Sequence, residues 1–356
     1  MSLHQVFTGQ PQAQHVLLRM IRKGKLPHAL LFTGMPGVGK KALALEVAKA
    51  LNCSEKMELS QNESSPIMAC GRCVSCSKIV RGVHPDVMVI SKDGSAIKLA
   101  QIRSLKERCR VHPYEGRRRV IILEDCQDLT EEAANALLKI LEEPPASNVF
   151  LLLAPEPYNL MPTIVSRCCH LRCRPLDPQS VAETLRDEMS LDEETALRLA
   201  HLSFGSLEKA RAWAQEKLLE RMESVMERLE KILQSPMIDF FQDVAQWAKE
   251  TENLEQDLEC IKFAVREVLV THLKSSANTT CTEAAPVARA PWKHSRVESL
   301  VHVLEVLETA LQHLKAHAAK QLLLEAVCLK IKDVVYGQSG KGYRYPFPRG
   351  RKGLSL

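Results

Sequence analysis

The sequence predicts a parallel α/β domain followed by all-α domains, and three observations support this. Four short apolar runs lie in the first 175 residues, and each is continuous rather than alternating. Stretches with helical spacing separate these runs. After Pro175 the strand-like runs stop and only helical spacing continues. The 356 residues also exceed the roughly 250 to 300 residues at which single cores stop growing, so we expect two or three domains.

The apolar runs and the helical patterns alternate along the first part of the chain. Continuous apolar strands are typical of a sheet covered by helices on both faces. Thr130 is a suitable N-cap for the last helix of this part, and Pro144 should end that helix. The predicted strands are 29–32, 87–90, 120–123 and 149–153, and the helices between them are 41–51, 99–110 and 131–143.

The rest of the chain is predicted to be helical. Gly205 interrupts the pattern and suits a helix end followed by a new start. A segment rich in Ser, Thr, Ala and Pro, 275–291, is typical of an exposed loop. The predicted helices are 178–189, 192–203, 206–233, 237–248, 254–273 and 295–332. The predicted divisions are a core at 1–175 with a cysteine module at 53–76, a small helical domain at 176–215, a larger one at 216–336 and a basic flexible tail at 337–356.

Composition excludes several classes of protein. The chain is 45% hydrophobic and 26% charged, a balance typical of globular proteins and not of disordered ones. No apolar run approaches the ~20 residues of a membrane span. Met1–Gln14 lacks the features of a signal peptide, so we expect a cytoplasmic protein without membrane contact. The net charge of +5 equals the five basic residues of the tail, and this small surplus alone does not indicate nucleic-acid binding.

A phosphate-binding loop follows the first predicted strand and opens the first predicted helix. Gly34, Gly37, Gly39 and Lys40 fit the pattern G-x-x-x-x-G-K, in which backbone amides converge on phosphate oxygens and the lysine reaches the outer phosphates. Lys41 follows where Ser or Thr normally holds Mg²⁺. The loop can still bind phosphate, but ATP with Mg²⁺ is a doubtful ligand and hydrolysis should be poor.

An acid pair ends the third predicted strand. Glu124 and Asp125 stand where carboxylates would position a metal, although the usual order is Asp then Glu. The alternative is two solvated acids at the end of a strand.

Four cysteines predict a structural metal site. Three are spaced C-x₂-C-x₂-C, and the fourth follows the first predicted helix. In a chain for which no signal peptide is expected, clustered cysteines favour a metal site or catalysis over disulfides. Four thiolates suit tetrahedral Zn²⁺. An iron–sulfur cluster is the rival, but the common run needs a cysteine where Val80 stands. His84 is a possible substitute ligand, and free thiols are the remaining alternative. The four are Cys53, Cys70, Cys73 and Cys76.

The order of these motifs resembles the bacterial DNA polymerase III clamp-loader subunits, which are AAA+ proteins. The resemblance is specific because several motifs occur in register, and it covers roughly residues 1–215. It implies an AAA+ core, a helical lid at 176–215 and a collar that joins the subunits at 216–336. The matching segments are 28–32, 50–53, 70–76, 84–87, 135–144 and 166–168.

Two kinds of subunit in that family are candidates. The tau/gamma subunits are ATPases, whereas the delta prime subunits commonly have an impaired nucleotide site. This sequence departs from the ATPase pattern at Lys41, at Glu124-Asp125, at the apolar Leu153-Ala154-Pro155, and at Glu208, where the family has a sensor arginine. These departures favour a delta prime-like chain without ATPase activity of its own. An ATP-hydrolysing subunit and a non-catalytic zinc-bearing scaffold remain alternatives.

Arg167 lies in an intact Ser-Arg-Cys motif. The resemblance implies an arginine finger that reaches into the ATP site of a neighbouring subunit, where it stabilises charge on the transferring phosphoryl group. Without the resemblance, Arg167 would be an ordinary surface arginine.

The implied partners are the tau/gamma and delta subunits, in a ring that opens the beta sliding clamp and places it on primed DNA. The implied location is the cytoplasmic replisome at the nucleoid, as part of the DNA polymerase III holoenzyme. Two basic segments, Arg117–Arg119 and the tail with its Tyr343, Tyr345 and Phe347, can contact DNA or can simply be solvated.

Overall fold

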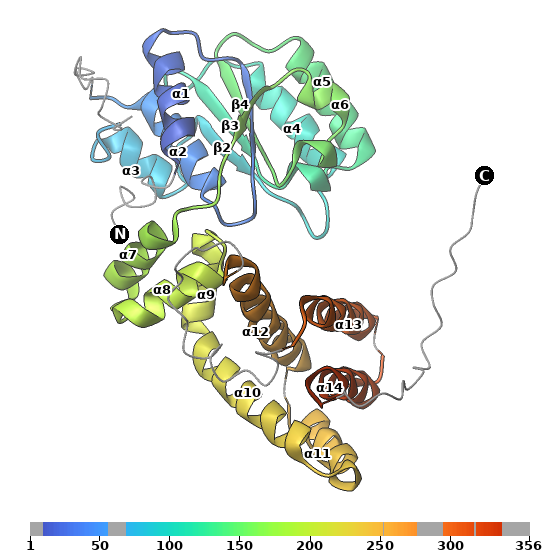
Figure 1. Cartoon of the computed structure of the whole chain (residues 1–356). Coiled ribbons are helices and arrows are strands. Elements are labelled where there is room, and N and C mark those ends of the chain that lie inside the picture. Colours follow the sequence, from blue (N-terminus) through green and yellow to red (C-terminus); the bar gives the residue numbers. More distant parts are fainter. Residues whose placement is uncertain (1–9, 56–68, 252, 276–294, 317, 337–356) are drawn as a thin grey trace. The chain divides into compact units, whose positions relative to one another are not determined.

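The computed structural model describes residues 10–55, 69–251, 253–275, 295–316 and 318–336. The predicted basic tail, and all but the first residue of the predicted loop at 275–291, lie outside these residues. The chain forms two compact units, residues 1–215 and residues 216–356. Every described helix and strand lies wholly within one of the two units (Figure 1).

The first unit contains a parallel sheet with the strand order β2-β3-β4-β1-β5. All four neighbouring pairs are parallel, with Leu31 opposite Leu152 and Ile121 opposite Phe150. The prediction of a parallel α/β fold is therefore confirmed. The strands are β1 Ala29–Thr33, β2 Val87–Ile90, β3 Arg119–Leu123, β4 Asn148–Ala154 and β5 Cys169–Arg172.

Helices cover both faces of this sheet (Figure 1). Because successive strand residues point to opposite faces, Leu30 and Phe32 enter the core under α1 and α2, while Leu31 enters the core under α4 and α5. Thr130 caps α5, its hydroxyl accepting the N–H of Ala133, as predicted. The helices are α1 Pro11–Arg22, α2 Lys40–Asn52, α3 Val74–Val80, α4 Leu99–Cys109, α5 Glu131–Glu142 and α6 Pro162–Val165, with short 3₁₀ turns at Cys126–Asp128 and Pro157–Asn159.

Four helices and strands of this core were absent from the prediction: α1, α3, α6 and β5. The four residues of β5 alternate between buried and solvent-facing positions, since β5 lies at the edge of the sheet and lacks the continuous apolar signal. The first unit ends with α7 Pro178–Met189, α8 Glu193–Leu202 and α9 Leu207–Gln215.

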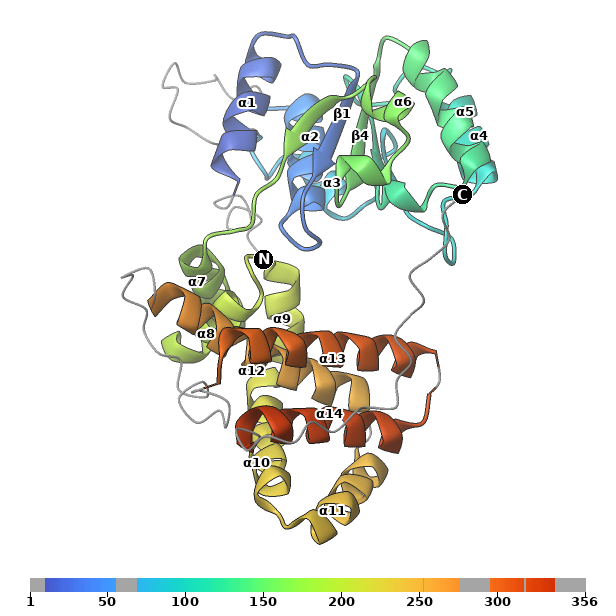
Figure 2. The same cartoon turned by 45° about the vertical axis from the view of Figure 1, so that its right-hand side comes forward.

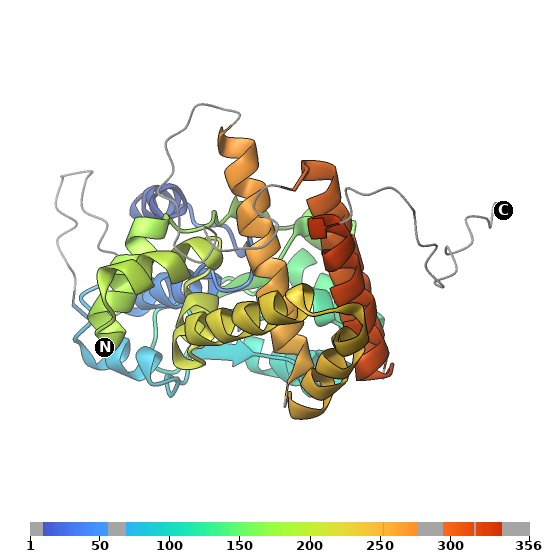
Figure 3. The same ribbon diagram turned by 60° about the horizontal axis from the view of Figure 1, so that its bottom comes forward.

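The helices are the only regular elements among the described residues of the second unit. The predicted helix at 206–233 is wrong as one element: it is divided at Lys217, whose φ is 51°. The predicted helix at 295–332 is also two helices. The helix α13 packs against both α12 and α14, and α11 packs against α14 (Figures 2 and 3). The helices are α10 Leu218–Gln234, α11 Met237–Glu250, α12 Leu254–Ser275, α13 Val297–Lys315 and α14 Lys320–Tyr336.

A buried carboxylate organises part of the second unit. Asp257 accepts hydrogen bonds from the Trp247 indole at 3.1 Å and the Thr251 hydroxyl at 2.5 Å, and it pairs with Arg221 at 2.8 Å. These contacts tie α10, α11 and α12 together around a charge that is almost fully buried. None of the described helices combines the length and the apolar character that crossing a bilayer requires.

Candidate functional site

The phosphate loop lies between β1 and α2, as the sequence predicts. Gly37 has a φ of +80°, and a Cβ atom at this position would lie only 2.1 Å from the Ser206 Oγ and 2.9 Å from the Glu208 Cβ. The Gly34 N–H donates to the Pro155 carbonyl at 2.9 Å. The loop is therefore closely packed against residues from the start of α9, and only glycine fits at position 37.

Lys40 is turned back onto its own loop. Its Nζ donates to the Gly34 carbonyl at 2.5 Å and to the Met35 carbonyl at 2.9 Å. Burial lowers the pKa of Lys40, and the nearby Asp125 and Glu208 carboxylates oppose that shift. The ammonium that the sequence assigned to the outer phosphates is thus engaged by main-chain oxygens.

Lys41 pairs directly with the acid that ends β3. The distance from its Nζ to the Glu124 Oε1 is 2.7 Å. A lysine ammonium therefore lies beside a carboxylate that the sequence placed at the metal position. Asp125 follows with a φ of 48°, a left-handed conformation that is strained for a non-glycine residue. The structure thus brings Glu124, Asp125 and both lysines together beside the loop.

The acids around the loop disfavour a phosphate chain. Asp125, Glu156 and Glu208 all lie close enough to Lys40 to act on its charge. A carboxylate repels phosphate oxygens in a site of low dielectric. The geometry consequently suits a loop that is held closed by its own side chains better than a loop that binds ATP with Mg²⁺ and hydrolyses it.

Arg167 lies just beyond α6, on the side of the sheet covered by α4 and α5. Its guanidinium donates to the Glu142 Oε1 at 2.7 Å and to the Thr163 carbonyl at 3.0 Å. Its side chain keeps 36% of its accessible surface. A guanidinium can bridge to phosphate oxygens through its remaining N–H groups.

The four predicted metal ligands come together. The Sγ atoms of the cysteines all lie within 4.8 Å of one another. Cys53 follows the end of α2, while the others precede and enter α3. The Cys53 Sγ lies 3.5 Å from that of Cys70 and 3.9 Å from that of Cys73. His84 stays outside the group, so the described residues present a four-sulfur set.

Backbone amides prepare this cluster to hold negative charge. The Cys73 Sγ accepts the N–H of Cys76 at 3.4 Å, and the Cys70 Sγ accepts the N–H of Cys73 at 3.3 Å. Burial acts to raise the pKa of Cys73, but hydrogen bonds from the backbone of Cys76 and Ser54 and from the thiols of Cys76 and Cys70 outweigh it and bring the pKa down to about 6. Burial raises the pKa of Cys76. Four clustered sulfurs with N–H donors fit a tetrahedral, thiophilic metal ion, and no position is left open for a substrate.

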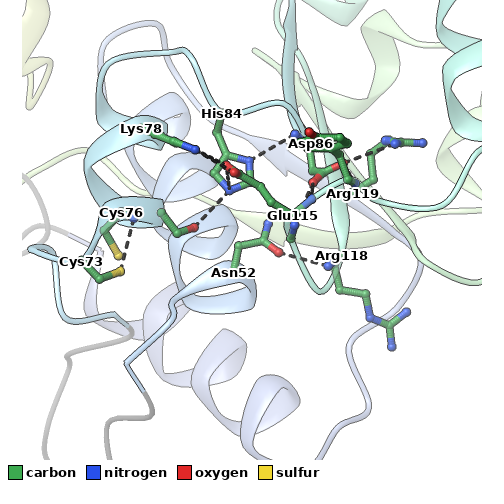
Figure 4. A network of polar contacts seen from close by, with 12 residues as sticks. Asn52, Cys73, Cys76, Lys78, His84, Asp86, Glu115, Arg118 and Arg119 are labelled. Carbon is green, nitrogen blue, oxygen red and sulfur yellow. Dashed lines mark hydrogen bonds and ion pairs between the residues drawn. The ribbon is translucent and has the colours of Figure 1, made fainter.

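A polar network links the cysteine module to the sheet (Figure 4). His84 is buried; its Nδ1 accepts the Asp86 N–H at 3.1 Å, so its Nε2 carries the proton toward the Ser75 hydroxyl, also at 3.1 Å. Lys78, on α3, pairs with Glu115 at 2.7 Å. The segment before β3 is therefore attached to the helix that carries Cys76.

Asp86 is the centre of this network, and sequence reasoning missed its role. The carboxylate is fully buried; it accepts the N–H groups of Tyr114, Glu115 and Gly116, each at 2.8 Å, and faces the Arg119 guanidinium at 3.3 Å. Burial acts to raise the pKa of Asp86, but the three N–H donors and Arg119 together hold it below the usual value. The sequence offered one signal for this role of Asp86. The segment His84-Pro85-Asp86 is part of the resemblance, and its acid directly follows a proline.

Arg119 is consequently a structural residue. Its guanidinium also donates to the carbonyls of Arg108, Val111 and His112 at the end of α4. Of the basic run considered for DNA contact, only Arg117 and Arg118 remain exposed.

Comparisons with known proteins identify the relatives of the chain. Residues 9–177 match the model of a family described as DNA polymerase III, delta subunit. The delta prime subunit of Bacillus subtilis DNA polymerase III is 29% identical over 328 residues, which cover 91% of this chain and 96% of that protein. The delta prime subunit of Pseudomonas aeruginosa is 34% identical over 213 residues, 58% of this chain and 61% of that protein. The tau subunit of Escherichia coli is 33% identical over 214 residues, 58% of this chain but only 32% of that protein.

Proposed function

We propose, from the premise that this chain is a delta prime-like member of the DNA polymerase III clamp-loader family, that it presents Arg167 to the ATP site of a neighbouring subunit. One observation carries this proposal above the others. Both cations of its own phosphate loop already have partners there, Lys40 the loop carbonyls and Lys41 the Glu124 carboxylate, whereas the partly exposed Arg167 keeps an Nε–H without a hydrogen-bond partner among the described residues. The chain is thus poorly arranged to use ATP itself and suitably arranged to assist a neighbour.

In the proposed chemistry, this chain contributes a single side chain, that of Arg167. As charge builds on the phosphoryl group in the neighbouring site, the Arg167 guanidinium would donate hydrogen bonds to the phosphate oxygens. ATP and Mg²⁺ would therefore belong to the neighbour. The proposed neighbours are tau/gamma-type and delta-type subunits, and the proposed target of the assembly is a sliding clamp loaded on primed DNA.

The cysteine cluster is proposed to hold a structural Zn²⁺. Cys53, Cys70, Cys73 and Cys76 would supply four thiolates, and the N–H donors around them would stabilise the charge. When bound, the metal would contribute to folding of the module rather than to any reaction. The module would then hold α3, and through Lys78 the segment before β3.

The domain roles are also proposed from the resemblance. Residues 1–175 would form the AAA+ core, 176–215 the lid, and 216–336 the collar through which subunits assemble.

The test is ATP turnover in the assembled complex. The gain in turnover when this chain is added to its tau/gamma-type and delta-type partners should fall by about tenfold or more in Arg167→Ala, with assembly unchanged by size-exclusion chromatography. Arg110→Ala, at an exposed arginine on the end of α4, is the matched control. An unchanged gain with Arg167→Ala would contradict the proposal. Titration of the isolated chain with ATP and Mg²⁺ should show no turnover, and turnover there would instead identify an ATPase subunit.

A further inference from the structure

The contact between Arg167 and Glu142 joins two neighbouring elements of the core. Glu142 is the last residue of α5, and Arg167 follows α6 after one residue. The NH2 group of the arginine donates to the Glu142 Oε1 at 2.7 Å. The two side chains are 36% and 49% exposed, so the pair lies at the surface, where a partner subunit can reach it.

Both ends of this ion pair rest on rigid structure. Leu141, next to Glu142, and Ile164, in α6, are buried in the same hydrophobic core under the sheet. The Arg167 N–H donates to the Ile164 carbonyl at 3.1 Å. The carboxylate and the start of the arginine side chain are therefore held at a constant separation by packed elements.

The donors of Arg167 are used unequally. NH1 donates to the Thr163 carbonyl at 3.0 Å and contacts the Ser166 hydroxyl at 3.4 Å, while NH2 donates to Glu142. The Nε–H has no hydrogen-bond partner among the described residues. A guanidinium carries five N–H donors in a planar fork, so the contacts fix its plane and leave donors available for an incoming oxyanion.

We propose that Glu142 is a positioning residue for Arg167, which holds the guanidinium in the orientation that the neighbouring ATP site requires. This inference rests on the proposed function. A free arginine side chain samples many rotamers, and only some of these point its donors at a phosphate. By selecting one orientation before assembly, Glu142 raises the fraction of encounters in which the arginine is correctly placed.

The expected effect is modest because the pair is half exposed. Ion pairs of this kind change an equilibrium about two- to fivefold. We therefore expect Glu142→Ala to lower the turnover gained on adding this chain by about two- to fivefold in kcat, with the KM for ATP unchanged. Glu142→Gln keeps an acceptor without the charge and should fall between the wild type and the alanine variant.

Two further variants separate positioning from other effects. Glu143→Ala removes the adjacent exposed acid, which has no contact with Arg167 among the described residues, and should leave turnover unchanged. In the Arg167→Ala background, Glu142→Ala should have no additional effect, since it acts through the arginine. Assembly of each variant is checked by size-exclusion chromatography.

The outcomes distinguish this inference from the proposed function. If Arg167→Ala lowers the gain by about tenfold or more and Glu142→Ala leaves it unchanged or raises it, the positioning role is wrong while the proposed function stands. If Glu142→Ala lowers the gain equally in the Arg167→Ala background, the carboxylate acts independently of the arginine and the inference is again wrong. If Arg167→Ala has no effect, the proposed function itself fails.

Discussion

Replacing Asp86 with Asn should open the sheet of the first unit at β2 and β3. The substitution keeps the shape of the side chain but removes its charge from a fully buried position. Whichever way the amide is oriented, its NH₂ group faces N–H donors that the carboxylate had accepted, either those of Glu115 and Gly116 or that of Tyr114. Arg119, itself only 8% exposed, loses its counter-charge.

The size of this effect follows from the burial of both partners. Removing one partner of a buried ion pair costs about 3–5 kcal/mol, because the other charge stays buried without compensation. Hydrogen bonds to a charged group contribute about 1.5–3 kcal/mol each, but they share a single carboxylate and do not simply add. We therefore expect the free energy of opening at β2 and β3 to fall by about 3–5 kcal/mol.

Amide hydrogen exchange measured on peptides from β2 and β3 is a suitable assay, since it reports on this sheet separately from the helical second unit. The expected loss of protection is roughly 10²- to 10⁴-fold. The control is Asp93→Asn, because the Asp93–Lys98 pair is exposed on both sides and should contribute no more than ~1 kcal/mol. A loss of protection for Asp86→Asn as small as that for the control would refute the central role of this carboxylate.

The same carboxylate predicts an acid dependence with a definite sign. The pKa of Asp86 is lower in the folded chain than its ordinary value of 3.8. Its stabilising effect is therefore complete above that ordinary value and is lost as the pH falls through the depressed folded pKa. Protection of β2 and β3 should decline below about pH 4 in the wild type, and Asp86→Asn should abolish this component.

Three further predictions concern the metal, the phosphate loop and the second unit. Cys73→Ser should reduce bound zinc, measured by atomic emission, from about one ion per chain to well below half, whereas Cys126→Ser, outside the cluster, should not change it. Lys41→Thr restores a hydroxyl for Mg²⁺, so calorimetric titration should show ATP binding that Mg²⁺ strengthens, whereas Mg²⁺ should not strengthen binding to the wild type. Asp257→Asn should destabilise the second unit by about 2–4 kcal/mol, which urea unfolding followed by Trp247 fluorescence, with Trp213 and Trp292 replaced by Phe, would detect as an earlier transition; an unchanged midpoint would exclude a structural role for the buried carboxylate.

The fold of the core could be predicted from the sequence wherever a buried element is marked by a continuous run of apolar residues. The continuous apolar runs at β1, β3 and β4 exist because both faces of a central parallel strand are covered by helices. The edge strand β5 has no such run, because half of its residues face solvent. The prediction of a single helix at 206–233 was wrong for another reason. Lysine is common inside helices, so the residue type at position 217 does not indicate the left-handed conformation that Lys217 adopts between α9 and α10.

The candidate site was predictable as a set of residues but not as an arrangement. The spacing of Cys70, Cys73 and Cys76 places three sulfurs together through local geometry, so the cluster could be expected. The partners of Lys41 and Arg167 are Glu124 and Glu142, far away in sequence, and no local rule selects them.

The sequence by itself determined the parallel core, the phosphate loop with its missing hydroxyl, the cysteine set and the resemblance to clamp-loader subunits, because each depends on residue types at short, regular spacing. The tertiary structure alone decided how the charges are paired. It turned Lys40 onto the loop carbonyls, placed Arg119 against the buried Asp86, and set Arg167 beside Glu142. Charge pairing depends on which side chains the packed elements bring within a few ångströms of one another, and that is a property of the folded chain as a whole.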